Sequence, residues 1–182
     1  MTGNQPERSS ESYFDQEFAT PAVKIQAGEL FATAEPVAIT TLLGSCVSVC
    51  LYDRSRGVGG MNHFLLPELL KGVSAASCPD SCLAGCCARY GTCAMRLLIQ
   101  RLELLGASRG RLEAKLFGAG RMMPTGVDIG AKNAAFALAH LEKQGIPVRA
   151  SDLGGNRPRR VAFFPATGRA FVKYARELPA GM

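Results

Sequence analysis

Short apolar runs broken by glycine, proline and charged residues fill both ends of the sequence. Runs of this length that are rich in β-branched residues are typical of strands. They predict strands at residues 23–25, 29–33 and 36–43. Residues 47–52 and 58–66 form two more apolar runs. The pattern leaves open whether residues 47–66 are a strand hairpin or a helix start followed by a strand.

The middle of the chain has the period of a helix instead. Residues 90–105 place apolar side chains on one face and polar ones on the other, and Gly106 supplies the stop. An alanine-rich segment at 129–143, ended by Gly145, predicts a second helix. Further strands are expected at residues 112–117, 148–153, 160–164 and 170–172.

Together these elements predict a single α/β domain of layered, sandwich-like sheets with helices packed outside. A chain of 182 residues suits one hydrophobic core. Residues 1–20 are polar and lack apolar periodicity, which predicts a flexible tail, so the domain is expected at residues 21–176. Its least regular part is a cysteine-rich loop at about residues 72–88.

Apolar runs in this sequence are broken well short of the ~18 residues that a membrane-spanning helix needs. The first residues are polar and lack the apolar core of a secretory signal. These two features predict a cytoplasmic protein that does not insert into a membrane.

The net charge of +6 favours acidic partners. Aromatic residues make up only 7% and tryptophan is absent, so the sequence offers no obvious platform for stacking bases, and nucleic acid is not expected as a partner. A basic region near the C-terminus is either a solvated face or a docking surface for an acidic partner. It contains Arg157, Arg159, Arg160, Lys173 and Arg176.

Seven cysteines are many for a chain of this length. An odd number without a secretory signal favours reduced thiols, a metal site or a catalytic thiol over a disulfide framework. Four of them are close together, and an inert insertion, a redox-active group and a metal site all remain open for them. Their spacing is not a common zinc pattern, and neither a metal nor another cofactor is expected. They are Cys78, Cys82, Cys86 and Cys87.

The candidates for acid–base chemistry are few, because the chain has only two histidines. His140 lies inside the alanine-rich helix, where a packing role is the simplest interpretation. His63 follows two glycines that would let another backbone or a substrate approach. Cys46 follows Gly44 and Ser45 at the exit of an apolar strand. Taken alone, each of the two site candidates is more typical of a structural residue.

Considered as a pair, Cys46 and His63 suggest nucleophilic catalysis. They lie on neighbouring apolar segments, and a hairpin-like return would bring them side by side. Such a dyad needs a third group to orient the imidazole, and Thr40 and Thr41 on the preceding strand are candidates. Backbone N–H groups in the turn could stabilise an oxyanion. The residues expected at this substrate and oxyanion site are Gly44, Ser45, Val47 and Asn62.

The two motifs around this pair are similar to those of the CheD family. The first is TLLGSCVSVCLYD at residues 41–53, and the second is GGMNHFLLP at residues 59–67. Shorter matches follow at residues 89–91, 115–120, 129–133 and 152–161. The resemblance covers roughly residues 22–174. The sequence departs from the family pattern in the cysteine-rich loop, in the N-terminal tail and in the order Gly118-Ala119-Gly120.

The resemblance implies a catalytic triad of Cys46, His63 and Thr40, although a shift of one residue would exchange Thr40 for Thr41. It also implies deamidation of glutamine side chains on the cytoplasmic helices of methyl-accepting chemoreceptors, with methyl-ester hydrolysis as a further activity. The expected mechanism starts from a Cys46 thiolate beside a protonated His63 and needs no cofactor. The implied fold is that of cytotoxic necrotizing factor deamidases.

Three other functions compete with this hypothesis. A transglutaminase or a thiol protease would use the same thioester with another acceptor or another scissile bond. A non-catalytic adaptor would bind a CheC-like phosphatase or receptor helices. The resemblance also makes such a phosphatase an expected partner of the enzyme itself.

Overall fold

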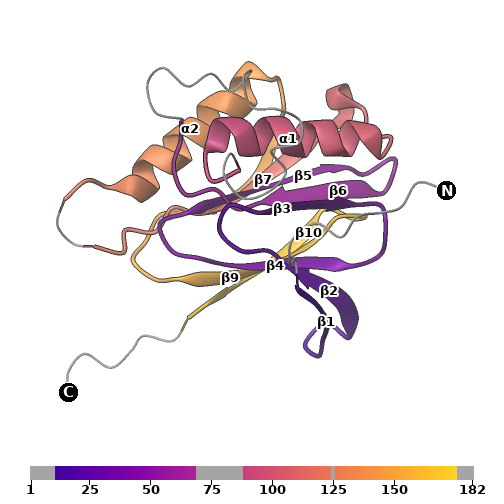
Figure 1. The fold of residues 1–182 in the computed structure, drawn as a ribbon, viewed down its shortest axis with the longest axis horizontal. Coiled ribbons are helices and arrows are strands. Elements are labelled where there is room, and N and C mark those ends of the chain that lie inside the picture. The colour runs from indigo at the N-terminus through magenta and orange to yellow at the C-terminus, as the bar shows by residue number, and fades with distance from the viewer. Residues whose placement is uncertain (1–10, 69–87, 124–125, 176–182) are drawn as a thin grey trace.

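A computed structural model describes residues 11–68, 88–123 and 126–175. These residues form two stacked five-stranded sheets, and two helices cover one of the sheets (Figure 1). The outer sheet has, in spatial order, β1 (Glu11–Asp15), β2 (Thr20–Lys24), β4 (Ala38–Leu43), β9 (Arg159–Phe164) and β10 (Arg169–Tyr174). The central sheet has β3 (Leu30–Thr33), β6 (Val58–Asn62), β5 (Val47–Asp53), β7 (Glu113–Gly118) and β8 (Val148–Leu153).

Most neighbouring strands are antiparallel, and the pairs β2–β4 and β7–β8 are parallel. Consecutive strands β4 and β5 lie in different sheets. The chain therefore crosses from the outer to the central sheet at residues 44–46. β5 and β6 form an antiparallel hairpin, so the alternative of a helix start after Cys46 is wrong.

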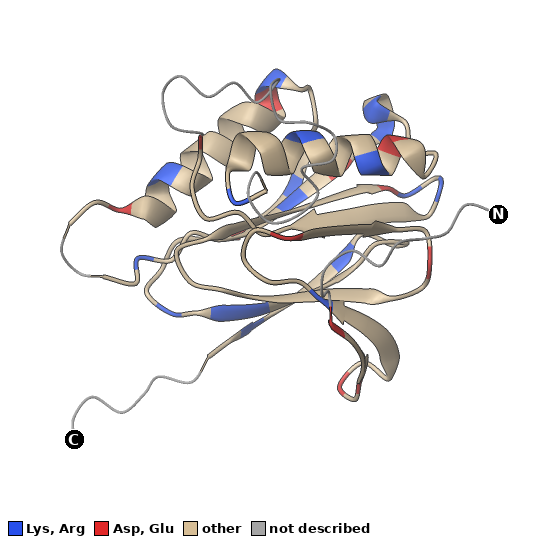
Figure 2. Ribbon diagram, in the orientation of Figure 1, with Lys and Arg blue, Asp and Glu red and all other residues tan. Residues whose placement is uncertain are grey.

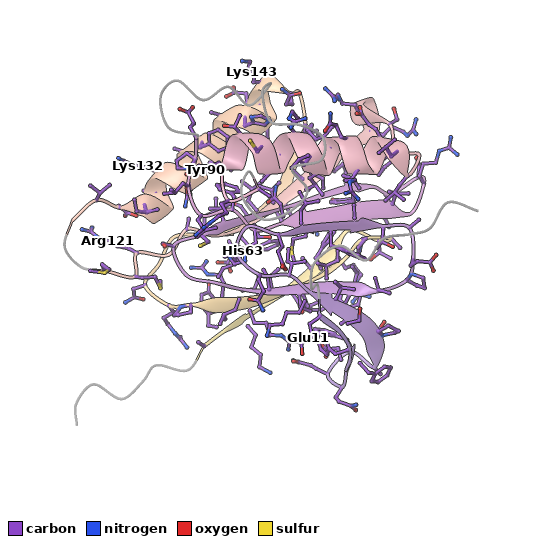
Figure 3. The ribbon with its side chains drawn as sticks, viewed as in Figure 1. Glu11, His63, Tyr90, Arg121, Lys132 and Lys143 are labelled. Atoms are coloured by element: carbon purple, nitrogen blue, oxygen red, sulfur yellow. The ribbon has the colours of Figure 1, made fainter. Side chains whose placement is uncertain are left out.

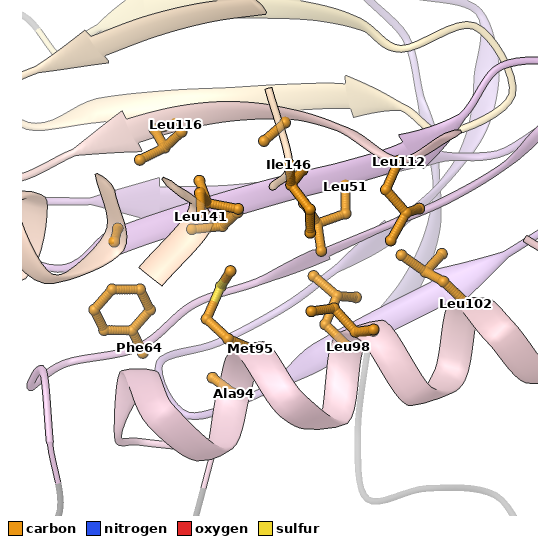
Figure 4. Close-up of a cluster of buried hydrophobic side chains, with 14 of the residues drawn as sticks. Leu51, Phe64, Ala94, Met95, Leu98, Leu102, Leu112, Leu116, Leu141 and Ile146 are labelled. Carbon is orange, nitrogen blue, oxygen red and sulfur yellow. The ribbon is translucent and has the colours of Figure 1, made fainter. Parts of the chain in front are cut away.

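The helices α1 (Gly91–Leu104) and α2 (Ile129–Lys143) bury their apolar faces on the central sheet (Figure 4). Leu98 and Leu102 of α1 are fully buried against strand residues such as Leu51. A second core fills the space between the two sheets. The prediction of layered sheets with helices outside is therefore confirmed, as are the two helices and the strands expected from the sequence.

The N-terminal region differs from the expected tail. Residues 11–15 form strand β1, which pairs with β2 at the edge of the outer sheet. Tyr13 bonds the Thr40 hydroxyl at 2.9 Å, and the buried Asp15 carboxylate pairs with Arg160. Polar side chains thus anchor a strand that has no apolar period. The expected tail before Glu11 and the cysteine-rich loop, apart from Ala88, lie outside the described residues.

The described basic residues near the C-terminus lie on and beside β9 and β10 (Figure 2), and most of them are paired within the fold. Arg159 is 1% exposed, and its guanidinium donates to the Asp152 side chain and to the Gly154 carbonyl. Lys173 lies 3.2 Å from Glu17. These contacts favour a structural role over a docking surface for the described members of the group.

In the described ranges, no helix is both long enough and apolar enough to cross a membrane.

Candidate active site

The crossing between the sheets is a short loop held by the end of β7. The Gly44 carbonyl accepts from the N–H of Gly120, and the Cys46 carbonyl accepts from the N–H of Ala119, both at 2.8 Å. Gly118 has φ +107°, and a Cβ there would lie 2.2 Å from the Cys46 carbonyl oxygen. Only glycine fits this close approach, so the β7 end fixes the backbone at Cys46.

Cys46 and His63 come together because β5 and β6 continue their pairing beyond the strand ends. Val47 and Phe64 exchange backbone hydrogen bonds of 3.2 and 3.0 Å. In this register His63 stands opposite Ser48, so Cys46 is its diagonal neighbour on the same face. Diagonal neighbours lie about 7 Å apart, within reach of an imidazole. Both side chains face the layer between the sheets, and Figure 3 shows His63 there.

A hydroxyl of the outer sheet holds the imidazole from the other side. Thr41 Oγ1 lies 2.8 Å from His63 Nδ1, and the same hydroxyl donates its proton to the Ile25 carbonyl at 2.8 Å. A hydroxyl has one proton, so Thr41 must accept the bond from Nδ1–H. This fixes the tautomer of neutral His63 and leaves the lone pair on Nε2.

The structure places Thr41, rather than Thr40, beside His63. Successive side chains of β4 point to opposite faces, so Thr40 lies on the outer face of the sheet, where it is buried and bonded to Tyr13. Of the two threonines considered for the third position of the expected triad, Thr41 is therefore the one that contacts His63. The neighbouring Ile39 and Leu43 share the inward face of Thr41 and are fully buried in the core between the sheets.

His63 Nε2 is buried and accepts no hydrogen bond from any of the described residues. Burial lowers the pKa of this imidazole to about 4. A free lone pair on a neutral imidazole is the form that a general base requires at neutral pH.

Burial also raises the pKa of the Cys46 thiol, although its own backbone N–H partly offsets this. Both shifts favour a resting pair of neutral thiol and neutral imidazole. This differs from the expected thiolate beside an imidazolium. The helix N-terminus that would have lowered the thiol pKa is missing, because Val47–Asp53 is a strand.

The residues expected at the oxyanion site separate in the structure. The Val47 N–H donates to the Phe64 carbonyl and is unavailable. Asn62 faces the helices, where its side chain accepts from the Val49 N–H and contacts the sulfur of Met95. Within the described part of the chain, the N–H groups of Ser45 and Cys46 have no hydrogen-bond acceptor beyond the Cys46 side chain.

Asn133 of α2 is a positioning residue that the sequence argument did not identify. Its side-chain amide is fully buried and donates to the Ser45 carbonyl at 3.1 Å and to the Leu65 carbonyl at 2.9 Å. Cys46 stands opposite Leu65 in the strand register, so this side-chain amide ties the loop that contains Cys46 to the segment after His63. The motif at residues 129–133 pointed to this helix but not to the role of Asn133.

Cys46 opens onto a cleft of about 610 Å³. The cleft offers apolar surface from two leucines, a tyrosine at the start of α1 and one exposed cation. Its described lining comprises Ser45, Cys46, Leu65, Leu66, Arg89 and Tyr90.

The remaining candidates take no part in this site. His140 packs on Phe136 with ring centroids 5.6 Å apart, and Cys50 is fully buried between the sheets. In the ranges that the structure describes, no three metal-ligating side chains cluster. Cys78, Cys82, Cys86 and Cys87 lie outside those ranges.

Comparison with known proteins gives consistent matches. The family model described as CheD chemotactic sensory transduction matches residues 76–174. The chain is 45% identical over 168 residues to the probable chemoreceptor glutamine deamidase CheD of Methylobacillus flagellatus, covering 91% of this chain and 80% of that protein. It is 47% identical over 172 residues to probable chemoreceptor glutamine deamidase CheD 1 of Shewanella oneidensis, covering 93% and 78%.

The crystal structure of a Neisseria meningitidis protein of the family DUF152 aligns with this chain over 78% of this chain and 62% of the Neisseria chain. The TM-score is 0.41 and the identity is 14%. A likeness this weak carries no argument about fold or function. The expected likeness to cytotoxic necrotizing factor deamidases stays a prediction.

The lowered pKa of His63 predicts how stability depends on pH. Between pH 6.5 and about 4 the unfolded chain binds a proton at His63 that the folded chain does not. The free energy of unfolding should therefore fall as the pH falls through this window, by up to about 3 kcal/mol from this group. Above pH 6.5 the ionisation of His63 should add no pH dependence to the free energy of unfolding.

Urea unfolding at pH 7, 6 and 5 measures this effect. His63→Gln should be less sensitive to acid than the parent, whereas His140→Gln should keep most of the parent's slope. Identical slopes in the parent and in His63→Gln would contradict the buried neutral imidazole.

Proposed function

This chain belongs to the CheD family, and on that premise we propose that it is a protein-glutamine glutaminase that deamidates chemoreceptors. The similarity on which this rests spans more than nine-tenths of the chain and about four-fifths of relatives named as chemoreceptor glutamine deamidases. The aligned span includes the strands that bring Cys46 and His63 together.

One observation carries the chemical side of the proposal: the hydrogen-bond chain from Ile25 through Thr41 to His63 Nδ1. It leaves a neutral, buried Nε2 lone pair on the face that Cys46 shares. Nε2 takes the thiol proton as Cys46 Sγ attacks the amide carbon of the glutamine side chain. Removing the proton during the attack avoids a buried charge in the resting enzyme.

The attack creates an oxyanion that needs nearby donors. The backbone N–H of Cys46 is directed to the thiol sulfur and has no other acceptor among the described residues. We assign this N–H, with that of Ser45, to the oxyanion. The assignment replaces Val47 and Asn62, whose polar groups are bonded elsewhere.

The tetrahedral intermediate collapses when the imidazolium gives its Nε2 proton to the leaving nitrogen. The C–N bond breaks, ammonia departs and a Cys46 thioester remains. Water then loses a proton to Nε2 and attacks the thioester carbon. The C–S bond breaks, the thiol recovers a proton and glutamate is released. The balance is one water consumed and one ammonia formed for each glutamine.

The same acyl-thioester would form from a glutamate methyl ester, with methanol leaving in place of ammonia. Methyl-ester hydrolysis is therefore a second proposed activity of this site. A CheC-like partner, a purely adaptor role and a cytoplasmic location stay predictions.

The proposal is tested by incubating the protein with a chemoreceptor cytoplasmic fragment. Mass spectrometry should find a gain of about one dalton at each modified glutamine, with one equivalent of ammonia released. Cys46→Ala should abolish both signals, because a nucleophile has no substitute. Cys50→Ala is the matched control on the same strand face and should keep most of the activity. Activity that survives Cys46→Ala would refute the assignment. Ammonia release that comes with a cross-linked product in place of the one-dalton gain would indicate a transglutaminase.

The two adjacent threonines give a second prediction. Thr41→Val removes the hydroxyl that holds His63 and should lower kcat about 10- to 100-fold, because the imidazole loses its orientation. Thr40→Val changes a residue of the same type on the opposite face of β4. It should leave kcat within about threefold of the parent. Steady-state ammonia release from the receptor fragment measures both, and a larger loss in Thr40→Val would restore the original assignment of the triad.

A further inference from the structure

The cleft in front of Cys46 contains one charged side chain that amide hydrolysis does not use. Arg89 is exposed, and it is the only charged residue in the described lining. A glutamine side chain is neutral, and the apolar surfaces of Leu65 and Leu66 suit its methylene groups. The exposed cation is therefore available to another part of a bound substrate.

The backbone fixes Arg89 at the cleft wall. Its carbonyl accepts from the N–H groups of Leu65 and Leu66 at 2.9 and 3.2 Å. The adjacent Tyr90 forms a parallel bridge with Leu66 and begins α1, and Figure 3 shows it above the central sheet. The position of Arg89 is thus set by main-chain contacts rather than by its own side chain.

Backbone spacing gives the separation from the nucleophile. Cys46 stands opposite Leu65, and Arg89 lies one further strand spacing beyond Leu65. Two spacings place the Arg89 backbone about 10 Å from that of Cys46. In the described part of the chain, no carboxylate lies within ion-pair distance of its guanidinium.

An acidic side chain on the substrate fits this separation. On a helix, residues three or four positions apart have Cβ atoms about 5–6 Å from each other. The long side chains of arginine and glutamate close the remaining distance. Guanidinium also pairs with a carboxylate through strong, often bidentate hydrogen bonds. Given the proposed deamidase function, we infer that Arg89 selects glutamines that have an acidic residue three or four positions away on the same helix face.

Two helical peptides and four proteins test the inference. The peptides share one glutamine and differ in having glutamate or alanine at the positions three and four residues away. The proteins are the parent, Arg89→Gln, Arg89→Lys and Arg56→Gln. Arg56 is an exposed cation in the β5–β6 turn, at the far end of the hairpin from Cys46, and it serves as the matched control.

The parent should prefer the acidic peptide by about 3- to 10-fold in kcat/KM, as measured by ammonia release. The preference should lie mainly in KM, and it should shrink as salt rises from 50 to 500 mM. Arg89→Gln should lose the preference while its rate on the neutral peptide stays within about twofold of the parent. Arg89→Lys should keep part of the preference, and Arg56→Gln should keep all of it.

Each other outcome has a definite meaning. An equal loss on both peptides in Arg89→Gln would show a merely structural residue and overturn the inference. An unchanged preference in Arg89→Gln would also overturn it. A change confined to inhibition by the glutamate product would do the same, because it would place the product carboxylate at Arg89. If the parent releases ammonia neither from the two peptides nor from the receptor fragment, the proposed function itself is refuted.

Discussion

The hydroxyl of Thr41 is the contact on which the site depends. It lies on the outer sheet, donates to Ile25 beside it and accepts from His63 of the segment that extends the central sheet. Because the single proton of the Thr41 hydroxyl goes to Ile25, the hydroxyl accepts from Nδ1–H of His63, and Nε2 is left as the basic nitrogen. The buried surroundings then keep that nitrogen neutral, because a charged imidazole would lose its hydration. Two stacked sheets are needed for this arrangement, since neither sheet supplies both partners.

Cys46, the proposed nucleophile, is positioned by hydrogen bonds to backbone carbonyls, and a strand rather than a helix begins after it. Three consecutive carbonyls, those of Gly44, Ser45 and Cys46, are bonded by the β7 end and by Asn133. Among the described residues, the N–H of Ser45 has no acceptor and that of Cys46 has none beyond its own side chain. The contacts that order the loop thus leave these two N–H groups for the proposed oxyanion. Gly118, the last residue of β7, lies so close to the Cys46 carbonyl that a side chain there would displace a loop belonging to other strands.

Sequence reasoning predicted the layers and the Cys46–His63 pair because these follow from apolar period and from motif spacing. It failed where the choice depended on which face of a strand is inward. Both faces of β4 carry apolar residues: Leu42 is 60% exposed while Leu43 is fully buried, so the pattern could not separate Thr40 from Thr41. Val47 and Asn62 lie close to Cys46 and His63 in sequence, yet the Val47 N–H is used in strand pairing and the Asn62 side chain bonds the Val49 N–H. Strand β1 and the role of Asn133 could not be predicted, because both depend on hydrogen bonds to residues far away in the sequence.

The tautomer of His63 is the most direct test of this account. Nitrogen NMR of the imidazole in the resting protein at pH 7 distinguishes the two neutral forms from the imidazolium. The account predicts a neutral ring with the proton on Nδ1 and a bare Nε2. Thr41→Val should weaken this preference, and Thr40→Val should not. An imidazolium at pH 7, or a neutral ring protonated on Nε2, would contradict the assignment of His63 as the base that activates Cys46.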